Sequence, residues 1–293
     1  MDKNTKEKEE YLIDLHTHTI YSDGDLTPNE LIKLAYQKNI RTLSITDHDS
    51  IDAFKNIDYS IPESDYIKLI SGIELSAKVS KGTMHILGYN IDINNTELNS
   101  KINELKTNSA NKIISILEQI KKDYNIVFSY EELKDLFNLN HRLGRPDIAK
   151  LCIKNGYTNS VQEAFDRYLI PAYNKTRYNN KSLTYQECIA LIKNSGGIPV
   201  LAHPKSLELE ASELEILIKE MKLDGLEGIE VYHSSHLHEE VPLYQYLAAK
   251  YSLLESGGSD YHGITVKPKI ELGITRNKNV KIKKLSILNK ILK

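Results

Sequence analysis

The chain has 293 residues, of which 40% are hydrophobic and 27% charged, and its formal net charge is −2 at pH 7. This length fits one large globular domain or a domain with an insertion, and the near-zero charge excludes a generally basic, nucleic-acid-binding surface. The N-terminal decapeptide has no hydrophobic signal region, and no later apolar run is long enough to cross a bilayer. We therefore expect a cytoplasmic protein with no membrane partner.

The first third of the chain alternates between strand patterns and amphipathic helix patterns. Thr27 is suited to cap a helix whose first residue is Pro28. In chain order the patterns predict a strand at 11–16, a helix at 26–40, a strand at 41–46, a short helix at 49–57, and strands at 67–77 and 84–91.

This alternation stops at residue 96 and resumes after residue 181. The interval carries amphipathic patterns for a long helix at 96–122 and for shorter helices at 130–138, 146–155 and 160–168. Strands follow at 197–204, 225–233 and 253–260, and helices at 213–222 and 241–251. The alternation predicts a parallel α/β barrel. We interpret residues 1–95 and 182–293 as this barrel and residues 96–181 as a helical insertion over one of its ends. The alternative is a second domain with an unrelated task.

The two cysteines, Cys152 and Cys188, both lie in apolar, helix-like stretches. This setting indicates buried thiols in a reducing compartment and not a disulfide framework.

Histidines and carboxylates recur in or just after the predicted strands. One such histidine is usually structural, but packing alone would not gather many of them, because a buried unpaired carboxylate is costly. A divalent metal would offset that cost. The stretches are "DLHTHTIYSD", "SITDHDS", "SGIELSA", "MHILGYN", "VLAHP" and "SGGSDYHG".

As a set, these motifs resemble the PHP (polymerase and histidinol phosphatase) family of metal-dependent phosphoesterases. The resemblance implies a distorted (β/α)7 barrel with a site for two to three divalent metal ions. The mixed nitrogen and oxygen ligands suit Mn, Fe or Zn, and the lack of cysteine ligands argues against a structural zinc site. The matching ligand positions are His16, His18, Asp23, His48, Glu74, His85, His203, Asp260 and His262.

The resemblance also implies how these ligands are shared. One metal is expected at His16, His18 and Asp260. A second is expected at Asp23, His48 and His203. The third is expected at His85 and His262, with Glu74 bridging. Asp47 and Asp49 are expected to orient ligands or cap helices.

The insertion resembles the branch of the family that contains nucleoside 3′,5′-bisphosphate phosphatases and the 5′–3′ exoribonuclease RNase AM. The stretch "GRPDIA" matches a branch motif and makes Arg145 a candidate phosphate ligand at a helix start. Lys175 matches only across a short insertion, and Asp147 stands where the branch usually has His. A carboxylate there would repel a phosphate unless Arg145 or Arg142 pairs with it.

A Ser-His pair after the strand at 225–233 matches many relatives. Ser235 and His236 are therefore candidates to contact phosphate or, for His236, to protonate the leaving oxygen. We expect His233 and His238 to be solvated.

The function implied is hydrolysis of a phosphate ester of a nucleotide by a metal-bridging hydroxide. The substrate would be a nucleoside 3′,5′-bisphosphate, the 5′ end of a short RNA, or both, and no obligate protein partner is evident. The alternatives are a phosphatase for histidinol phosphate or another small molecule, and a non-catalytic metal-binding module.

Overall fold

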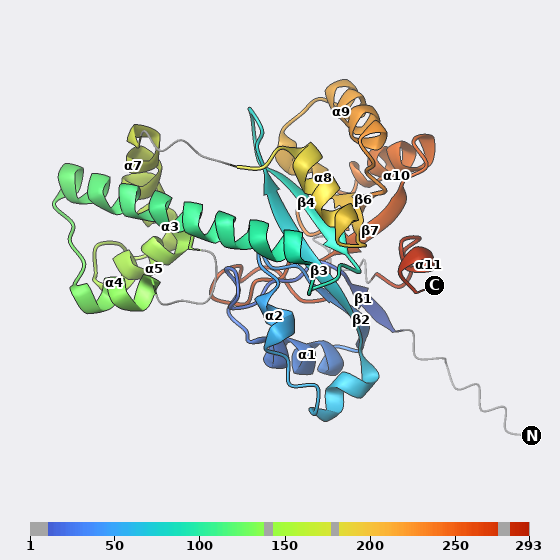
Figure 1. The fold of residues 1–293 in the computed structure, drawn as a ribbon, viewed down its shortest axis with the longest axis horizontal. Helices are drawn as coiled ribbons and strands as arrows, with labels where there is room; N and C mark the ends of the chain where they lie inside the picture. Colours follow the sequence, from blue (N-terminus) through green and yellow to red (C-terminus); the bar gives the residue numbers. More distant parts are fainter. Residues whose placement is uncertain (1–10, 138–142, 177–181, 275–281, 293) are drawn as a thin grey trace, which may run out of the picture.

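A sheet of seven strands lies at the centre of the molecule (Figure 1). The computed structural model describes residues 11–137, 143–176, 182–274 and 282–292. The strands pair in chain order and are β1 (Leu12–Asp14), β2 (Ile40–Ile45), β3 (Lys68–Ala77), β4 (Met84–Tyr89), β5 (Ile198–Leu201), β6 (Gly228–His233) and β7 (Leu254–Gly258).

The sheet is parallel except at β4, which is antiparallel to both β3 and β5. The expected parallel arrangement therefore holds for every strand except β4. The reason is the short link 78–83 between β3 and β4, which leaves no room for the crossover helix that parallel neighbours require.

The two edge strands meet and nearly close the sheet into a barrel. The Leu15 amide donates to the Gly257 carbonyl at 3.2 Å, and the Asp260 amide donates to the His16 carbonyl at 2.8 Å. The buried Asp14 carboxylate reinforces this seam by accepting from the Ser259 and Gly273 amides at 2.9 and 2.7 Å. The expected (β/α)7 barrel is thus confirmed in its essentials.

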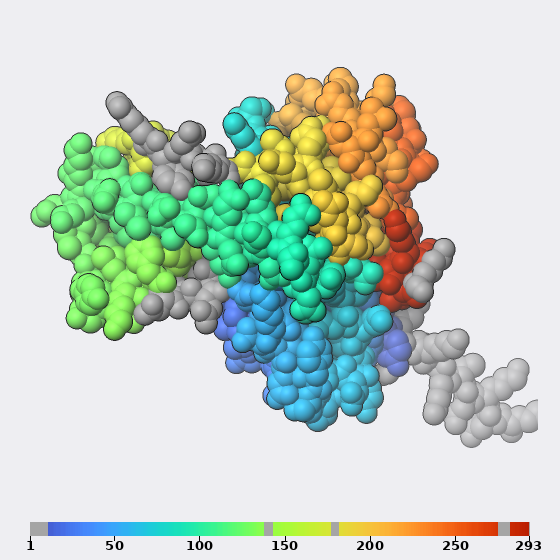
Figure 2. All heavy atoms as spheres, in the orientation of Figure 1, coloured from blue at the N-terminus to red at the C-terminus, as the bar shows by residue number. Residues whose placement is uncertain are grey.

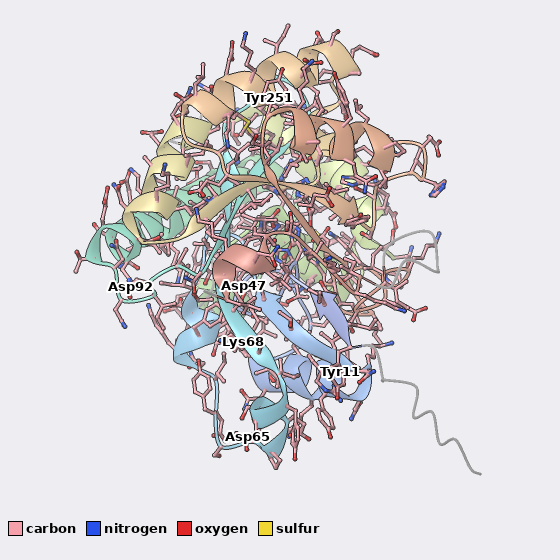
Figure 3. The ribbon with its side chains drawn as sticks, turned by 90° about the vertical axis from the view of Figure 1, so that its right-hand side faces the viewer. Tyr11, Asp47, Asp65, Lys68, Asp92 and Tyr251 are labelled. Carbon is pink, nitrogen blue, oxygen red and sulfur yellow. The ribbon has the colours of Figure 1, made fainter. Side chains whose placement is uncertain are left out.

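Helices cover the outside of the barrel on two sides of the sheet (Figure 1). The expected start of the first helix is confirmed, because the Thr27 side chain accepts from the Glu30 amide and Pro28 opens the helix. The helical elements around the barrel are α1 (Pro28–Gln37), α2 (Asp52–Lys55), η1 (Pro62–Tyr66), α8 (Tyr185–Asn194), η3 (Pro204–Leu207), α9 (Ala211–Leu223), α10 (Val241–Lys250) and α11 (Leu288–Ile291). Seen from the side in Figure 3, Tyr251 lies at the end of α10 near the periphery of the molecule.

The segment between β4 and α8 forms a helical lobe beside the barrel (Figure 2). Its elements are α3 (Thr96–Tyr124), α4 (Tyr130–Phe137), α5 (Arg145–Lys154), α6 (Val161–Ala164), the π-helical turn η2 (Phe165–Leu169) and α7 (Ile170–Lys175). The sequence patterns missed α7. None of the described helices combines the length and apolar character needed to span a membrane.

One helix belongs to both parts of the fold. The first turns of α3 place Leu98, Ile102 and Leu105 in a core shared with the barrel strands. Its later turns place Ile113, Ile116 and Ile120 in a separate core with α4, α5 and α7. The barrel and the lobe are therefore joined by one continuous helix as well as by the loops.

The lobe core allows a matched test on α3. We expect Ile116→Ala, which empties a fully buried position, to lower the free energy of unfolding by about 2–5 kcal/mol. Ile114→Ala, at a position that is 42% exposed, should change it by about 0.5 kcal/mol or less. Urea unfolding followed by circular dichroism compares the two. Equal losses in the free energy of unfolding would contradict the assignment of Ile116 to the buried face of α3 and of Ile114 to its exposed face.

Candidate metal centre

The strand ends bring all nine expected ligands to one end of the barrel. His16 and His18 follow β1, His48 follows β2, Glu74 and His85 lie on β3 and β4, and His203 follows β5. Asp260 and His262 follow β7, and Asp23 lies in the loop before α1. The backbone is strained at two of these positions, with φ of 22° at His203 and 58° at Asp260. Non-glycine residues rarely adopt positive φ outside such sites.

Several ligand atoms are buried without a hydrogen-bond partner within the described residues. They are His16 Nε2, His18 Nε2, His48 Nδ1, Asp23 Oδ1 and Glu74 Oε2. Each buried polar atom without a partner costs about 1–3 kcal/mol, so several in one place need an explanation. Nitrogen and carboxylate donors that converge in this way fit divalent metal ions.

Glu74 lies at the centre of the cluster. Its Oε2 is 3.3, 3.2 and 3.0 Å from His16 Nε2, His18 Nε2 and His48 Nδ1. Its Oε1 is 2.9 Å from both His85 Nδ1 and His203 Nε2. The two oxygens face different sets of imidazoles, which is the geometry expected of a bridging carboxylate.

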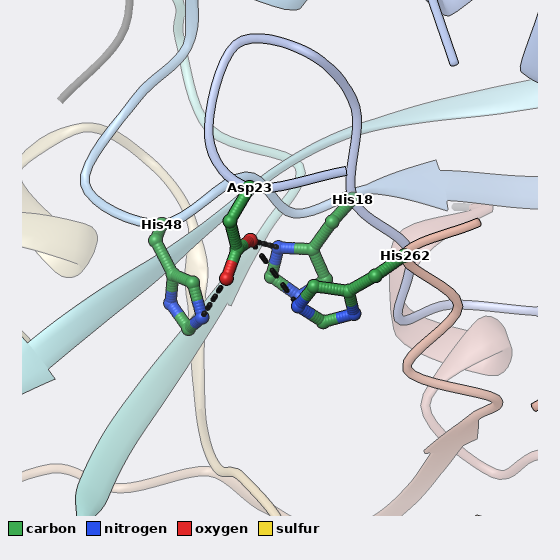
Figure 4. Close-up of side chains that lie close together, drawn as sticks. All are labelled: His18, Asp23, His48 and His262. Carbon is green, nitrogen blue, oxygen red and sulfur yellow. Dashed lines mark ion pairs between the residues drawn. The ribbon is translucent and has the colours of Figure 1, made fainter. Parts of the chain in front are cut away.

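Asp23 gathers a second set of imidazoles (Figure 4). Its Oδ1 is 3.2 Å from His262 Nε2 and 3.6 Å from His18 Nδ1, and its Oδ2 is 4.0 Å from His48 Nε2. The His262 ring is held in this orientation because its Nδ1 donates to the Asp260 carbonyl at 2.9 Å, so that Nε2 faces Asp23.

The distances favour a sharing of ligands in which His203 and His262 exchange the places expected of them. His203 lies 3.2 Å from His85, and His262 lies against Asp23. The strand order explains this, because β5 pairs with β4, which carries His85. The end of β7 instead meets the end of β1, near the Asp23 loop. The three residues of the expected set lie close together, with Asp260 Oδ1 3.5 Å from His16 Nε2 and 3.3 Å from His18 Nε2.

Glu230 is a site residue that the sequence analysis missed. Its carboxylate accepts from His16 Nδ1 at 3.0 Å and from the His203 amide at 2.8 Å. Burial raises the pKa of Glu230, but the neighbouring His16, His233 and His203 outweigh it and hold the pKa at about 2. Glu230 therefore fixes the His16 ring with Nε2 toward the cluster. The sequence does contain a signal for Glu230, which is a carboxylate in the middle of an otherwise apolar strand.

Asp47 and Asp49 support the cluster from outside. Asp47, which is buried just after the end of β2 and is labelled near the middle of the view in Figure 3, accepts from the Thr19 amide and from Ser22 Oγ at 2.7 and 2.6 Å. Ser22 Oγ lies 3.3 Å from His18 Nδ1, so Asp47 orients His18 through this hydroxyl. Asp49 accepts from the Ser76 amide and hydroxyl at 3.0 and 2.9 Å, next to Glu74.

The expectation that His233 is solvated is wrong. Its side chain is buried, with Nε2 3.4 Å from Asp260 Oδ2 and Nδ1 2.7 Å from Ser235 Oγ. The same Asp260 oxygen accepts from Lys267 Nζ at 2.6 Å, a second residue that the sequence analysis missed. His238 is exposed, as expected.

His236 is buried beside His233. Its Nδ1 donates to the Val231 carbonyl at 2.9 Å, and burial, reinforced by His233, lowers its pKa to about 4. At neutral pH the ring is therefore neutral, and its Nε2 carries no proton for a leaving oxygen.

A cleft separates the metal-ligand cluster from the helical lobe. Asp23, His48 and His85 line its barrel side, and Lys112, Ile113 and the turn at residues 143–147 line its lobe side. Arg145 faces this cleft, as expected of a phosphate ligand. Lys175 is not among the described residues that line it, and forms an ion pair with Asp123 at 2.9 Å.

The carboxylate of Asp147 is turned toward its own helix end. Its Oδ2 accepts from the Gly144 amide at 2.8 Å. The expected alternative partner Arg142 lies outside the described residues.

The sequence profile of the PHP domain matches residues 14–222. The chain belongs to the PHP-domain family. It is 31% identical over 264 residues to the 5′-3′ exoribonuclease Rnm of Escherichia coli, an alignment that covers 89% of this chain and 88% of the relative. It is 27% identical over 254 residues to the 3′,5′-nucleoside bisphosphate phosphatase of Chromobacterium violaceum, covering 85% and 87%.

Solved structures agree with the fold. A structure from Bifidobacterium adolescentis, described as a metal-dependent phosphoesterase, superposes with a TM-score of 0.77 at 27% identity, covering 96% of this chain and 95% of the other. This likeness covers the barrel and the lobe together.

Glu230 allows a test of the cluster that does not depend on catalysis. We expect Glu230→Gln to weaken Mn²⁺ binding about 10- to 100-fold, because the His16 ring loses its carboxylate partner. Isothermal titration calorimetry of metal-free protein measures the effect, and Glu239→Gln, on an exposed loop, is the control. An unchanged affinity would show that Glu230 has no role in positioning ligands.

Proposed function

We propose that the chain is a metal-dependent phosphoesterase that hydrolyses a phosphate ester of a nucleotide. The substrate is a nucleoside 3′,5′-bisphosphate, the 5′ end of a short RNA, or both. One observation carries the proposal: imidazole and carboxylate groups, several of whose buried atoms have no hydrogen-bond partner among the described residues, converge beside a cleft whose opposite wall bears Lys112 and Arg145.

Three groups of residues would hold two to three Mn, Fe or Zn ions. His16, His18 and Asp260 form the first group, and His85 and His203 form the second. Glu74 would be shared between these two groups. Asp23, His48 and His262 form the third group. Bound divalent ions supply Lewis acidity at the phosphoryl oxygens and lower the pKa of a water molecule.

The residues of the chain itself orient the reacting groups. Glu230, Asp47 and Lys267 fix the rings and carboxylates of the cluster, as their hydrogen bonds to His16, Ser22 and Asp260 indicate. Arg145 provides a positive charge on the far wall of the cleft. Burial lowers the pKa of Arg145, but a guanidinium remains charged at neutral pH. It can therefore donate two parallel hydrogen bonds to a phosphate.

The lobe accounts for the preference for a nucleotide with two phosphates. The cluster would hold the scissile phosphate while Arg145 holds the other. Binding energy at the second phosphate would position the first for reaction. The relatives named as an exoribonuclease and as a bisphosphate phosphatase support this class of substrate.

A phosphate-release panel with Mn²⁺ tests the function. It compares adenosine 3′,5′-bisphosphate, the two adenosine monophosphates, a 5′-phosphorylated oligoribonucleotide and histidinol phosphate. We expect the bisphosphate or the oligoribonucleotide to give the highest kcat/KM. A higher value for histidinol phosphate would overturn the assignment of substrate and leave the metal chemistry in place.

Arg145 gives a second prediction. We expect Arg145→Ala to lower kcat/KM for the preferred substrate about 10- to 100-fold, through the loss of about 1.5–3 kcal/mol of charge-assisted binding. Metal content should not change, because Arg145 contacts aromatic rings and not the ligand cluster. Arg167→Ala, in the same lobe at an exposed ion pair with Glu163, is the control. Unchanged kinetics in Arg145→Ala would assign this side chain a structural role.

A further inference from the structure

One oxygen of Asp260 has a different environment from the other carboxylate oxygens among the nine expected ligands. Both oxygens of Glu74 and both oxygens of Asp23 face imidazole nitrogens of other ligands. Asp260 Oδ1 also faces such imidazoles, whereas Oδ2 accepts from Lys267 Nζ at 2.6 Å and lies 3.4 Å from His233 Nε2. Asp260 therefore turns one oxygen toward the ligand cluster and the other toward two side chains outside the nine.

The His233 ring presents an N–H group to Asp260. The Ser235 amide donates to His233 Nδ1 at 3.0 Å, so Nδ1 carries no proton and the proton of the neutral ring is on Nε2. His233 lies in a group with His16 and Asp260 that could hold a metal ion, but a protonated Nε2 has no lone pair to offer. This N–H is buried with no other acceptor among the described residues, and Asp260 Oδ2 is therefore its partner.

Lys267 reaches Asp260 from the loop that follows β7. Its backbone amide donates to the Gly263 carbonyl at 3.0 Å. The loop is also held to the segment after β1, because the Asp25 carboxylate accepts from the Thr265 amide at 2.7 Å. The loop therefore presents the ammonium to Asp260 from a backbone that is fixed at two points.

Strand β6 supplies groups that act on the ligands of other strands. Among the seven strands that the structure describes, β6 is the one that neither carries nor precedes any of the nine expected ligands. It provides Glu230, which accepts from His16, and ends at His233, whose ring centre lies 5.2 Å from that of His203. Because β6 lies between β5 and β7, its last residue is placed beside Asp260.

We propose that Lys267 and His233 restrict Asp260 to metal binding through Oδ1 alone, and that this restriction favours transition-metal ions over Ca²⁺. Both are positioning residues, because they act on the ion through Asp260. The inference rests on the part of the proposed function in which the cluster binds divalent ions. It does not depend on which phosphate ester is hydrolysed.

The number of oxygens that a carboxylate supplies affects which ion it favours. Ca²⁺ takes about six to eight oxygen ligands and binds carboxylates through one or both oxygens. Mn, Fe and Zn ions need fewer donor atoms and accept imidazole nitrogens among them. With Oδ2 occupied, Asp260 adds a single oxygen to a cluster rich in imidazole, which suits these ions. Release of Oδ2 would let Asp260 chelate an ion through both oxygens, which suits Ca²⁺.

The measured quantity is the Ca²⁺ concentration that displaces half of the Mn²⁺ bound to the protein, followed by the electron paramagnetic resonance signal of free Mn²⁺. We expect Lys267→Met to lower this concentration about tenfold, as for other residues that orient a metal ligand. The lost charge acts equally on two divalent ions, so the displacement reports the geometry of the site. Lys267→Arg keeps a donor and should retain most of the wild-type value. Lys269→Met removes the same charge from an exposed position of the same loop and should leave the value unchanged.

His233 is tested with a matched pair of variants. His233→Gln keeps an N–H donor and should retain most of the wild-type value, whereas His233→Leu should lower it, because Asp260 Oδ2 loses a partner. Circular dichroism establishes that each variant is folded. The number of Mn²⁺ ions bound at saturation should be the same in His233→Gln and the wild type. The loss of one ion in this variant would make His233 a ligand and overturn the inference.

The outcomes separate this inference from the function on which it rests. If the wild-type protein binds Mn²⁺ and folded Lys267→Met and His233→Leu need the same Ca²⁺ concentration as the wild type, the inference is wrong and the proposed function stands. If the wild-type protein binds no Mn²⁺, the metal-dependent function fails, and the inference fails with it.

Discussion

The burial of the Glu74 carboxylate among five imidazoles is the constraint on which the structure depends. Burial raises the pKa of Glu74, but the surrounding histidines hold it well below its usual value, so the group stays ionised in the interior. A charge in that position is tolerable only if compensating groups are fixed around it. Those groups come from β1, β2, β4 and β5, which explains why the strand ends must meet at one point.

Two further buried carboxylates connect the strand ends of the barrel to one another and to the cluster. Asp14 joins the end of β1 to the segment after β7, and Glu230 joins β6 to His16 and His203. The backbones of the seam are also closely packed, because a Cβ on Gly258 would lie only 2.3 Å from the backbone nitrogen of His16. Barrel closure and ligand placement therefore depend on the same contacts, and a change in one affects the other.

The sequence predicted which residues the structure gathers at one end of the barrel, because their chemistry and spacing are local properties of the chain. It did not predict how His203 and His262 are shared, since that depends on which strands are neighbours and on the reversed direction of β4. His233, Glu230 and Lys267 were missed or misassigned for a related reason, as each acts through contacts far away in sequence. The place of Lys112 in the lining of the cleft had no signal in the sequence, because it is one of several lysines on an amphipathic helix.

The continuity of α3 makes the position of Lys112 at the cleft depend on helical register. Leu105 is fixed in the barrel core, and Lys112 lies seven residues later on the same helix. At 1.5 Å per residue, this places Lys112 roughly 10 Å further along the axis, almost two full turns from its anchor. A single residue inserted between them would turn Lys112 by about 100° and move it away from the cleft. The length of α3 between these two positions therefore fixes which side chain of the helix lines the cleft.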